Sequence, residues 1–188
     1  MSKNTLSYAD QINQQRLEKD NLFKNSATSP LTSLSLSTFT GLSYFPVDER
    51  YRISGILVKD STPAVVQLNT STGRNVGVER FGIARFGFDG KSFELVVYKT
   101  GNLNDFADAP GQLFIPFKDL TSGIQSHPAG RYLLISVNEG SNQVELDFNK
   151  AFNPLNSYNP ALESIIAPEE NMAGLSFTVG QRKFEDRK

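Results

Sequence analysis

The N-terminal segment, residues 1–28, has the residue spacing of a mostly polar helix. Its apolar residues Ile12, Leu17, Leu22 and Phe23 stand between Gln, Arg, Glu and Lys, which is typical of a helix with one weak apolar face. Ser7 precedes this run, where its hydroxyl can accept a hydrogen bond from the first helical turn. Pro30 ends it, because the proline ring disfavours helical geometry in the preceding residue. We expect a capped helix on the outside of the domain.

Residues 29–188 show short alternations of apolar and polar residues, separated by turns rich in Gly and Pro. Such alternation is typical of strands with one buried face. Candidate strands lie at 51–58, 64–68, 81–88, 91–98, 113–117, 131–137, 144–149 and 175–179. Pro116 places its strand at a sheet edge, or ends it, because proline donates no ladder hydrogen bond. The pattern predicts one mainly β domain, an antiparallel β-barrel or sandwich-like fold with the helix packed outside.

The dipeptide Asp89-Gly90 predicts a hairpin with a defined register. Its favoured two-residue turn needs positive φ angles, which Asp tolerates and Gly adopts freely. The resulting pairs are Phe88 with Lys91, Phe86 with Phe93, Ala84 with Leu95, Gly82 with Val97, Arg85 with Glu94, Ile83 with Val96 and Phe81 with Tyr98. Arg85 and Glu94 are then expected to form a cross-strand ion pair.

A second hairpin is predicted around Gly140-Ser141. This turn sets Leu133 opposite Phe148, Ile135 opposite Leu146 and Val137 opposite Val144, which makes one face of the hairpin apolar. Arg131 falls on that face at the first position of the strand. Its guanidinium is expected to pair with a buried carboxylate or to capture an anion.

The opposite face of this hairpin carries Tyr132, Glu145, Asp147 and Asn149, which point either to solvent or into a cavity. One interpretation is a pocket for a small polar ligand, covered by Tyr44 and Phe45. The other is the wet side of a half-exposed sheet, in which Asn side chains bond the following turn. The candidate ligand-binding residues are Tyr44, Arg131, Tyr132, Asp147, Asn149 and Asn153.

Charge and composition exclude several kinds of partner and several kinds of catalytic or metal site. Lys and Arg number 19 against 20 Asp and Glu, so no overall positive field favours nucleic acid or an anionic membrane. The chain has no Cys and one His, which excludes thiol chemistry and the usual imidazole-rich metal sites. We predict no metal site, and the sequence identifies no cofactor. No secretory signal or membrane-spanning stretch is visible, so a cytoplasmic protein is expected.

Several phrases together resemble one bacterial family, the domain of unknown function family sixteen-eighty-four. They are SPL at 29–31, FTGLSYFPVDERY at 39–51, LNTSTG at 68–73, FIPFKDLTSG at 114–123, AGRYL at 129–133, LDFNKAFNP at 146–154, APEEN at 167–171 and VGQRK at 179–183. The resemblance implies a largely β architecture and supplies no reaction, cofactor or substrate. The family's motif positions fall on Phe117, Asp119, Thr121, Gly123, Gly130, Arg131, Tyr132, Asp147, Asn149, Asn153, Pro154, Glu170 and Asn171.

This chain departs from the family pattern at polar positions. Gln125, Ser126 and His127 stand where the family commonly shows Glu-Thr-Tyr, and Asn156 and Ser164 stand at two frequent Cys positions. Gln cannot exchange a proton near neutral pH. The resemblance therefore disfavours catalysis that depends on Glu or Cys at these positions, whereas binding is less affected.

Three functions remain open. The leading hypothesis is a non-catalytic domain that binds a small polar molecule near the GRYL and LDFN segments. The alternative is a hydrolase-type enzyme that uses Asp119, Asp147 or His127 in the same pocket, although no Gly-x-Ser-x-Gly elbow is present. The third is a structural or protein-interaction domain, which a large exposed apolar patch would favour.

Overall fold

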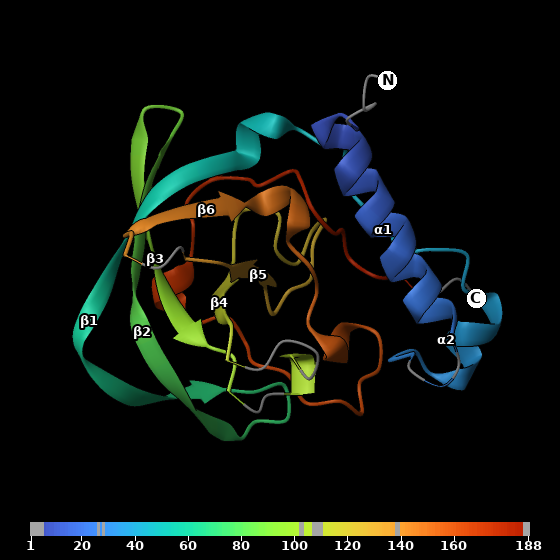
Figure 1. Cartoon of the computed structure of the whole chain (residues 1–188). Helices are drawn as coiled ribbons and strands as arrows, with labels where there is room; N and C mark the ends of the chain where they lie inside the picture. The colour runs from blue at the N-terminus through green and yellow to red at the C-terminus, as the bar shows by residue number, and fades with distance from the viewer. Residues whose placement is uncertain are drawn as a thin grey trace.

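A computed structural model describes residues 6–25, 27, 29–101, 104–106, 111–137 and 140–185. Its main element is a six-stranded antiparallel sheet in the order β5-β4-β3-β2-β1-β6. The strands are β1 (Arg52–Asn69), β2 (Asn75–Phe88), β3 (Lys91–Lys99), β4 (Leu113–Phe117), β5 (Arg131–Ile135) and β6 (Gln143–Asp147). The sheet curls into a half-barrel (Figure 1), and a bridge between Val137 and Val144 brings its two ends together. The predicted mainly β, antiparallel fold is confirmed.

Close backbone contact between β1 and β2 permits the curl. Gly82 lies opposite Lys59, and a Cβ atom at Gly82 would lie 2.2 Å from the carbonyl oxygen of Val58. The registers shift next to this point, between Lys59 and Ala64 on β1 and between Arg80 and Gly82 on β2. Such bulges bend a strand and increase its twist. The two strands predicted between residues 51 and 68 are therefore one long, bent strand.

The first predicted hairpin has the expected register except at its far end. The pairs Phe88–Lys91, Phe86–Phe93, Ala84–Leu95, Gly82–Val97, Arg85–Glu94 and Ile83–Val96 are all present. Arg85 and Glu94 form the predicted ion pair, with Nε and Oε1 2.7 Å apart. The last pair is wrong, because the bulge on β2 places Tyr98 opposite Arg80 instead of Phe81.

The second predicted hairpin is mostly wrong as a pairing. Val137 and Val144 do form a bridge, but Leu133 pairs with Ile115 of β4. The predicted partner of Ile135, Leu146, pairs instead with Ile53 of β1. The turn thus joins the two outermost strands of the sheet. The apolar face is nevertheless buried in the main core, which includes Leu133, Ile135, Val144, Leu146 and Phe148.

The C-terminal strand predicted at 175–179 is not part of the sheet. Phe177 and Val179 are buried, and the described hydrogen bonds of their backbone groups go to side chains. The Phe177 N–H donates to Asp119 at 2.8 Å, and the carbonyl oxygens of both residues accept from Arg131. Because buried backbone groups need partners, this buried ion pair replaces a neighbouring strand.

Pro116 interrupts one side of β4. The strand pairs with β5 along its length, but with β3 only at Leu113 and Phe114. It therefore lies inside the sheet order and not at the predicted edge, while its ladder with β3 ends before the proline. Asn171 fills the gap: its side chain accepts from the Val96 N–H at 2.6 Å and donates to the carbonyl oxygens of Val96 and Pro116 at 2.9 and 2.8 Å.

The predicted N-terminal helix is α1 (Tyr8–Lys24), and Ser7 caps it through the Asp10 N–H. It lies outside the half-barrel, on the side away from β1 and β2 (Figure 1), with Ile12 and Phe23 buried and Leu17 and Leu22 exposed. A second helix, α2 (Ser33–Thr38), was not predicted, because its Ser-rich sequence resembles a connector. Short 3-10 helices lie at Glu49–Tyr51, Asn104–Phe106, Phe148–Lys150, Leu155–Ser157 and Glu169–Asn171.

Candidate ligand-binding site

Asp147 and Asn149 are buried where β6 runs into a 3-10 helix, and neither lies on open surface. The Tyr8 hydroxyl of α1 donates to Asp147 Oδ1 at 2.6 Å, and Lys150 Nζ lies 3.3 Å from Oδ2. Burial and the Asp147 carboxylate raise the pKa of Tyr8, so its hydroxyl stays protonated. Asn149 exchanges two hydrogen bonds of 2.9 Å with the backbone of Asp48. The two side chains therefore hold α1 and the lead-in to β1 against the sheet.

Arg131 forms the predicted pair with a buried carboxylate. Its Nη2 lies 3.0 Å from Asp119 Oδ2, with both side chains almost completely buried. Nη1 donates to the carbonyl oxygens of Val179 and Gln181, and Nη2 also donates to that of Phe177. Burial lowers the pKa of Arg131, while Asp119 opposes that shift. The pair ties the C-terminal segment to the sheet.

Tyr132 and Asn153 are also bonded within the protein. The Tyr132 hydroxyl donates to the Ile165 carbonyl oxygen at 2.6 Å. The Asn153 N–H donates to Gln181 Oε1 at 2.7 Å, and its Nδ2 donates to the Arg182 carbonyl oxygen at 2.8 Å. Gln181 Oε1 accepts a further bond from the Tyr158 hydroxyl. Asn153 thus fixes the Gln181 side chain.

A cavity of about 140 Å³ lies between α1 and the segment that follows β6. Its walls are Ile12, Gln15, Arg16, Lys19, Tyr44, Asn149, Lys150, Ala151, Phe152 and Gln181. At roughly 30 Å³ per water molecule, the space corresponds to about four or five waters. Of the six predicted site residues, Tyr44 and Asn149 line this cavity, and Asn153 positions Gln181 behind it. Arg131, Tyr132 and Asp147 are not among its walls.

Arg16 lines the cavity and carries two hydrogen-bond donors without an acceptor in the described part of the chain. Its guanidinium carbon lies 4.5 Å from the centre of the Tyr44 ring, and Nη1 donates to the Phe45 carbonyl oxygen at 3.1 Å. Nε and Nη2 are buried and have no hydrogen-bond partner in the described part of the chain. Those two nitrogens form an edge of the guanidinium that can hold a carboxylate or phosphate through two parallel bonds.

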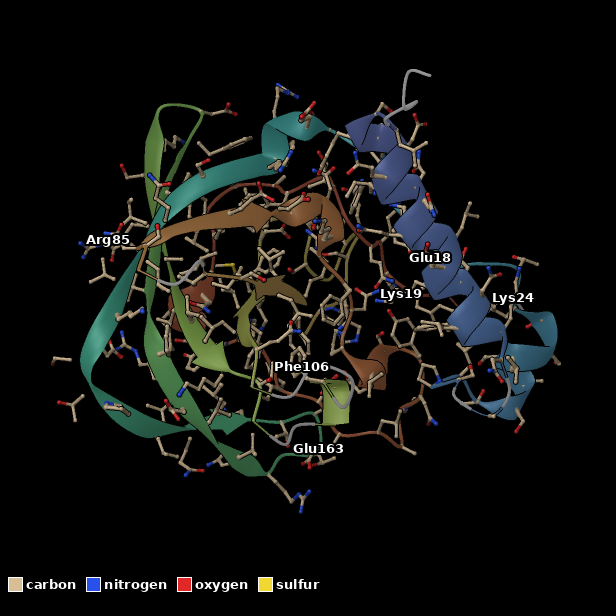
Figure 2. The ribbon with its side chains drawn as sticks, in the orientation of Figure 1. Glu18, Lys19, Lys24, Arg85, Phe106 and Glu163 are labelled. Carbon is tan, nitrogen blue, oxygen red and sulfur yellow. The ribbon has the colours of Figure 1, made fainter. Side chains whose placement is uncertain are left out.

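Lys19 adds a second cation to the same wall. Its ammonium lies 4.5 Å from the centre of the Phe152 ring and 5.9 Å from that of Phe23. Burial lowers the pKa of Lys19 to about 8, and the Asp20 carboxylate opposes that shift. In Figure 2, Lys19 lies on the side of α1 that faces the sheet, whereas Lys24 lies on the outer side. Among the described ion pairs, none involves Arg16 or Lys19.

The sequence-based reasoning missed Arg16, Lys19 and Gln181. A signal was present for the first two, because Ile12, Arg16, Lys19 and Phe23 follow the spacing of one helix face. Two cations at inward positions between two buried apolar residues are unusual for a helix packed on a domain. Gln181 had no comparable local signal, since its place depends on the path of the C-terminal segment.

A larger concavity, of about 1070 Å³, opens over β1, β2, β3 and β6. The charged residues that line it already have partners: Arg85 pairs with Glu94, and Glu145 pairs with Arg52 at 2.8 Å. Their side chains are also exposed. It therefore offers a ligand weaker recognition than the smaller cavity beneath α1.

His127 lies half-buried in the loop before β5. Its Nδ1 accepts a hydrogen bond from the Ala129 N–H at 3.2 Å. Burial, with a contribution from the Lys183 charge, lowers the pKa of His127 to about 4. The hydroxyl of Ser126, the residue before it, bonds to that of Thr121. The geometry therefore gives no support to a Ser-His-Asp arrangement.

The lowered pKa of His127 predicts acid sensitivity of the fold. In the unfolded chain the imidazole takes up a proton near pH 6.5, whereas in the folded chain it does so only near pH 4. The unfolded state binds more protons between these values, so the free energy of unfolding falls as pH falls through this window. We expect wild type to lose more stability than His127→Gln between about pH 7 and 5 in urea titrations. Equal losses in the two proteins would show that His127 titrates normally.

The model of the family described as Protein of unknown function (DUF1684) matches residues 37–182. The chain belongs to this family. Membership confirms the resemblance that the sequence phrases indicate. The cavity combines DUF1684 residues, Tyr44, Asn149 and Gln181, with Arg16 and Lys19, which precede the matched range.

A solved structure supports the same fold for this DUF1684 chain. It is the solution NMR structure of the uncharacterized protein from gene locus rrnAC0354 of Haloarcula marismortui. The two chains are 31% identical, the TM-score is 0.69, and the match covers 92% of each. No curated protein matches the chain.

Two features are absent from the described part of this DUF1684 protein. None of its described helices has the length and apolar character needed to cross a membrane. Within the same residues, no three His, Asp or Glu side chains are grouped so that they could hold a metal ion.

Proposed function

We propose that the protein is a non-catalytic β domain that binds a small polar molecule in the cavity beneath α1. The observation that carries this proposal is Arg16: the residue lines the cavity, and its Nε and Nη2 are buried without an acceptor in the described part of the chain. A buried donor without a partner costs about 1–3 kcal/mol. A ligand with acceptor atoms in the cavity would remove that cost, and this gain favours binding.

The six predicted site residues take two roles in this proposal. Tyr44 and Asn149 contact the ligand, because both line the cavity. Arg131, Tyr132, Asp147 and Asn153 support the walls through their bonds to Asp119, Ile165, Tyr8 and Gln181. A rigid supporting layer of this kind pre-organises a binding site and reduces the entropy lost on binding.

The residues considered for a hydrolase are not among the described walls of the cavity, which favours binding over that hydrolysis. General acid–base catalysis needs a titratable group within hydrogen-bond reach of the substrate. Asp119, Asp147 and His127, the groups considered for a hydrolase, are not among the described walls of the cavity. Asp119 and Asp147 are bonded to Arg131 and Tyr8.

Native mass spectrometry of the purified full chain tests this proposal. Gln15 is exposed and lies at the cavity wall, so Gln15→Trp is expected to fill the entrance. Asn13→Trp places the same side chain on an exposed position of α1 that does not line the cavity. We expect a co-purified small molecule on wild type and Asn13→Trp and its loss from Gln15→Trp. Bare protein in all three, or equal occupancy in all three, would refute the proposal.

A further inference from the structure

We infer that the cavity beneath α1 takes a small anion with a carboxylate or phosphate group, held by the Nε and Nη2 edge of Arg16 and by Lys19. This inference rests on the proposed function and names the chemical class of its ligand.

The geometry of Arg16 selects a planar or tetrahedral oxyanion. Nη1 is already engaged by the Phe45 carbonyl oxygen, and the Tyr44 ring lies against the guanidinium face. These contacts fix the side chain and leave one edge for a partner. Two parallel N–H groups on that edge match two oxygens of one carboxylate or phosphate. A neutral amide or alcohol offers a single acceptor and leaves the other nitrogen unsatisfied.

The charges around the cavity have the sign that an anion requires. Arg16, Lys19 and Lys150 line it, and among these only Lys150 has an ion-pair partner in the described chain, Asp147. Asp20 is adjacent to Lys19 in sequence, and its Oδ1 accepts from the Leu42 N–H. Burial raises the pKa of Tyr44 to about 12, so its hydroxyl is neutral. Three cations therefore line the cavity, and no Asp or Glu is among its described walls.

The remaining walls determine the size of the anion. A volume of about 140 Å³ is below the roughly 300–1,000 Å³ of pockets that hold drug-sized ligands. Ile12, Ala151 and Phe152 add apolar surface next to the cations. The cavity fits a short organic acid or an inorganic oxyanion, and it excludes a nucleotide.

Isothermal titration of the full chain at constant ionic strength tests the inference, with acetate, malonate and inorganic phosphate as probes. Acetamide serves as the uncharged analogue of acetate. We expect at least one anion to bind and acetamide to fail. Arg16→Met and Lys19→Met should each lower the affinity for that anion by at least about tenfold, which is the loss expected for one charge-assisted hydrogen bond. Arg16→Lys keeps the charge without the paired edge and should restore only part of the affinity.

Lys24→Met is the matched control, because Lys24 is an exposed cation of α1 outside the cavity. It should bind within about twofold of wild type, since a distant exposed charge is screened by salt. Equal weakening by Lys24→Met would reduce the effect to non-specific attraction and overturn the inference. Thermal melting of each variant beside wild type, with and without the anion, checks that the variant is folded.

The outcomes separate this inference from the proposed function. Acetamide binding as tightly as acetate, or an uncharged co-purified molecule on the wild type, would refute the anion class and leave small-molecule binding intact. If no probe binds but the co-purified molecule is an acid, the anion class is supported. If no probe binds and mass spectrometry shows bare protein, both proposals fail.

Discussion

Replacing Arg131 with Met is expected to lower the free energy of unfolding by about 3–5 kcal/mol. The change leaves the Asp119 carboxylate buried without its cation. It also removes the donors that satisfy the carbonyl oxygens of Phe177 and Val179. Because these oxygens belong to a buried segment without a neighbouring strand, the C-terminal segment should detach. Urea denaturation followed by circular dichroism measures the loss.

Arg85→Met is the control for this prediction. Arg85 also pairs with a carboxylate, that of Glu94, but both side chains are more than half exposed. Exposed ion pairs contribute about 0–1 kcal/mol, so this variant should remain close to wild type. A loss for Arg131→Met no larger than that for Arg85→Met would contradict the role assigned to the buried pair.

Replacing Asn171 with Leu is expected to cost about 2–4 kcal/mol of stability. Leu has a similar size but cannot accept from the Val96 N–H or donate to the carbonyl oxygens of Val96 and Pro116. Asn171 is fully buried, so water cannot replace the side chain without entering the core. Urea denaturation gives the global loss, and amide hydrogen exchange should accelerate first at Val96.

Asn142→Leu provides the comparison for Asn171→Leu. Asn142 is exposed, and its side chain forms no described hydrogen bond, so the substitution should change stability by less than about 0.5 kcal/mol. Similar stabilities for the two variants, or unchanged exchange at Val96, would show that the gap between β3 and β4 does not depend on the amide of Asn171.

Local patterns in the sequence predict the elements whose partners are close along the chain. The Ser7 cap and the hairpin pairs from Phe88 back to Gly82 both follow from short-range chemistry. The pairing beyond Gly82 does not, because the bulge next to it depends on how β1 crosses β2. The register of β2 and β3 shifts by one residue at this bulge, and the shift belongs to the curl of the whole sheet.

Long-range partners account for the larger errors. The alternation at 175–179 has the character of a strand, yet its backbone is satisfied by Arg131 and Asp119. The turn at Gly140 indicates a hairpin, yet β6 pairs with β1. Alternation reports which side chains are buried, and it does not report which backbone lies alongside.

In the candidate site, too, local patterns predict which residues are polar or buried, but they do not predict which segments come into contact. The sequence predicts Asp147 and Asn149 on the polar face of a strand, facing solvent or a cavity, and both are buried. Asn149 lines the cavity, whereas Asp147 does not. The cavity itself forms only when α1 docks on the segment after β6, which brings Arg16 and Lys19 to those residues. The cations on the inward face of α1 indicate a buried polar contact, but no pattern in α1 identifies the segment after β6 as the partner.

A crystal structure of the full chain as purified, with no anion added, tests the central claim most directly. The account predicts electron density larger than water in the cavity beneath α1, with acceptor atoms within hydrogen-bond distance of Arg16 Nε and Nη2. A cavity filled by ordered water alone, or Arg16 rotated to a protein acceptor so that the cavity closes, would contradict it.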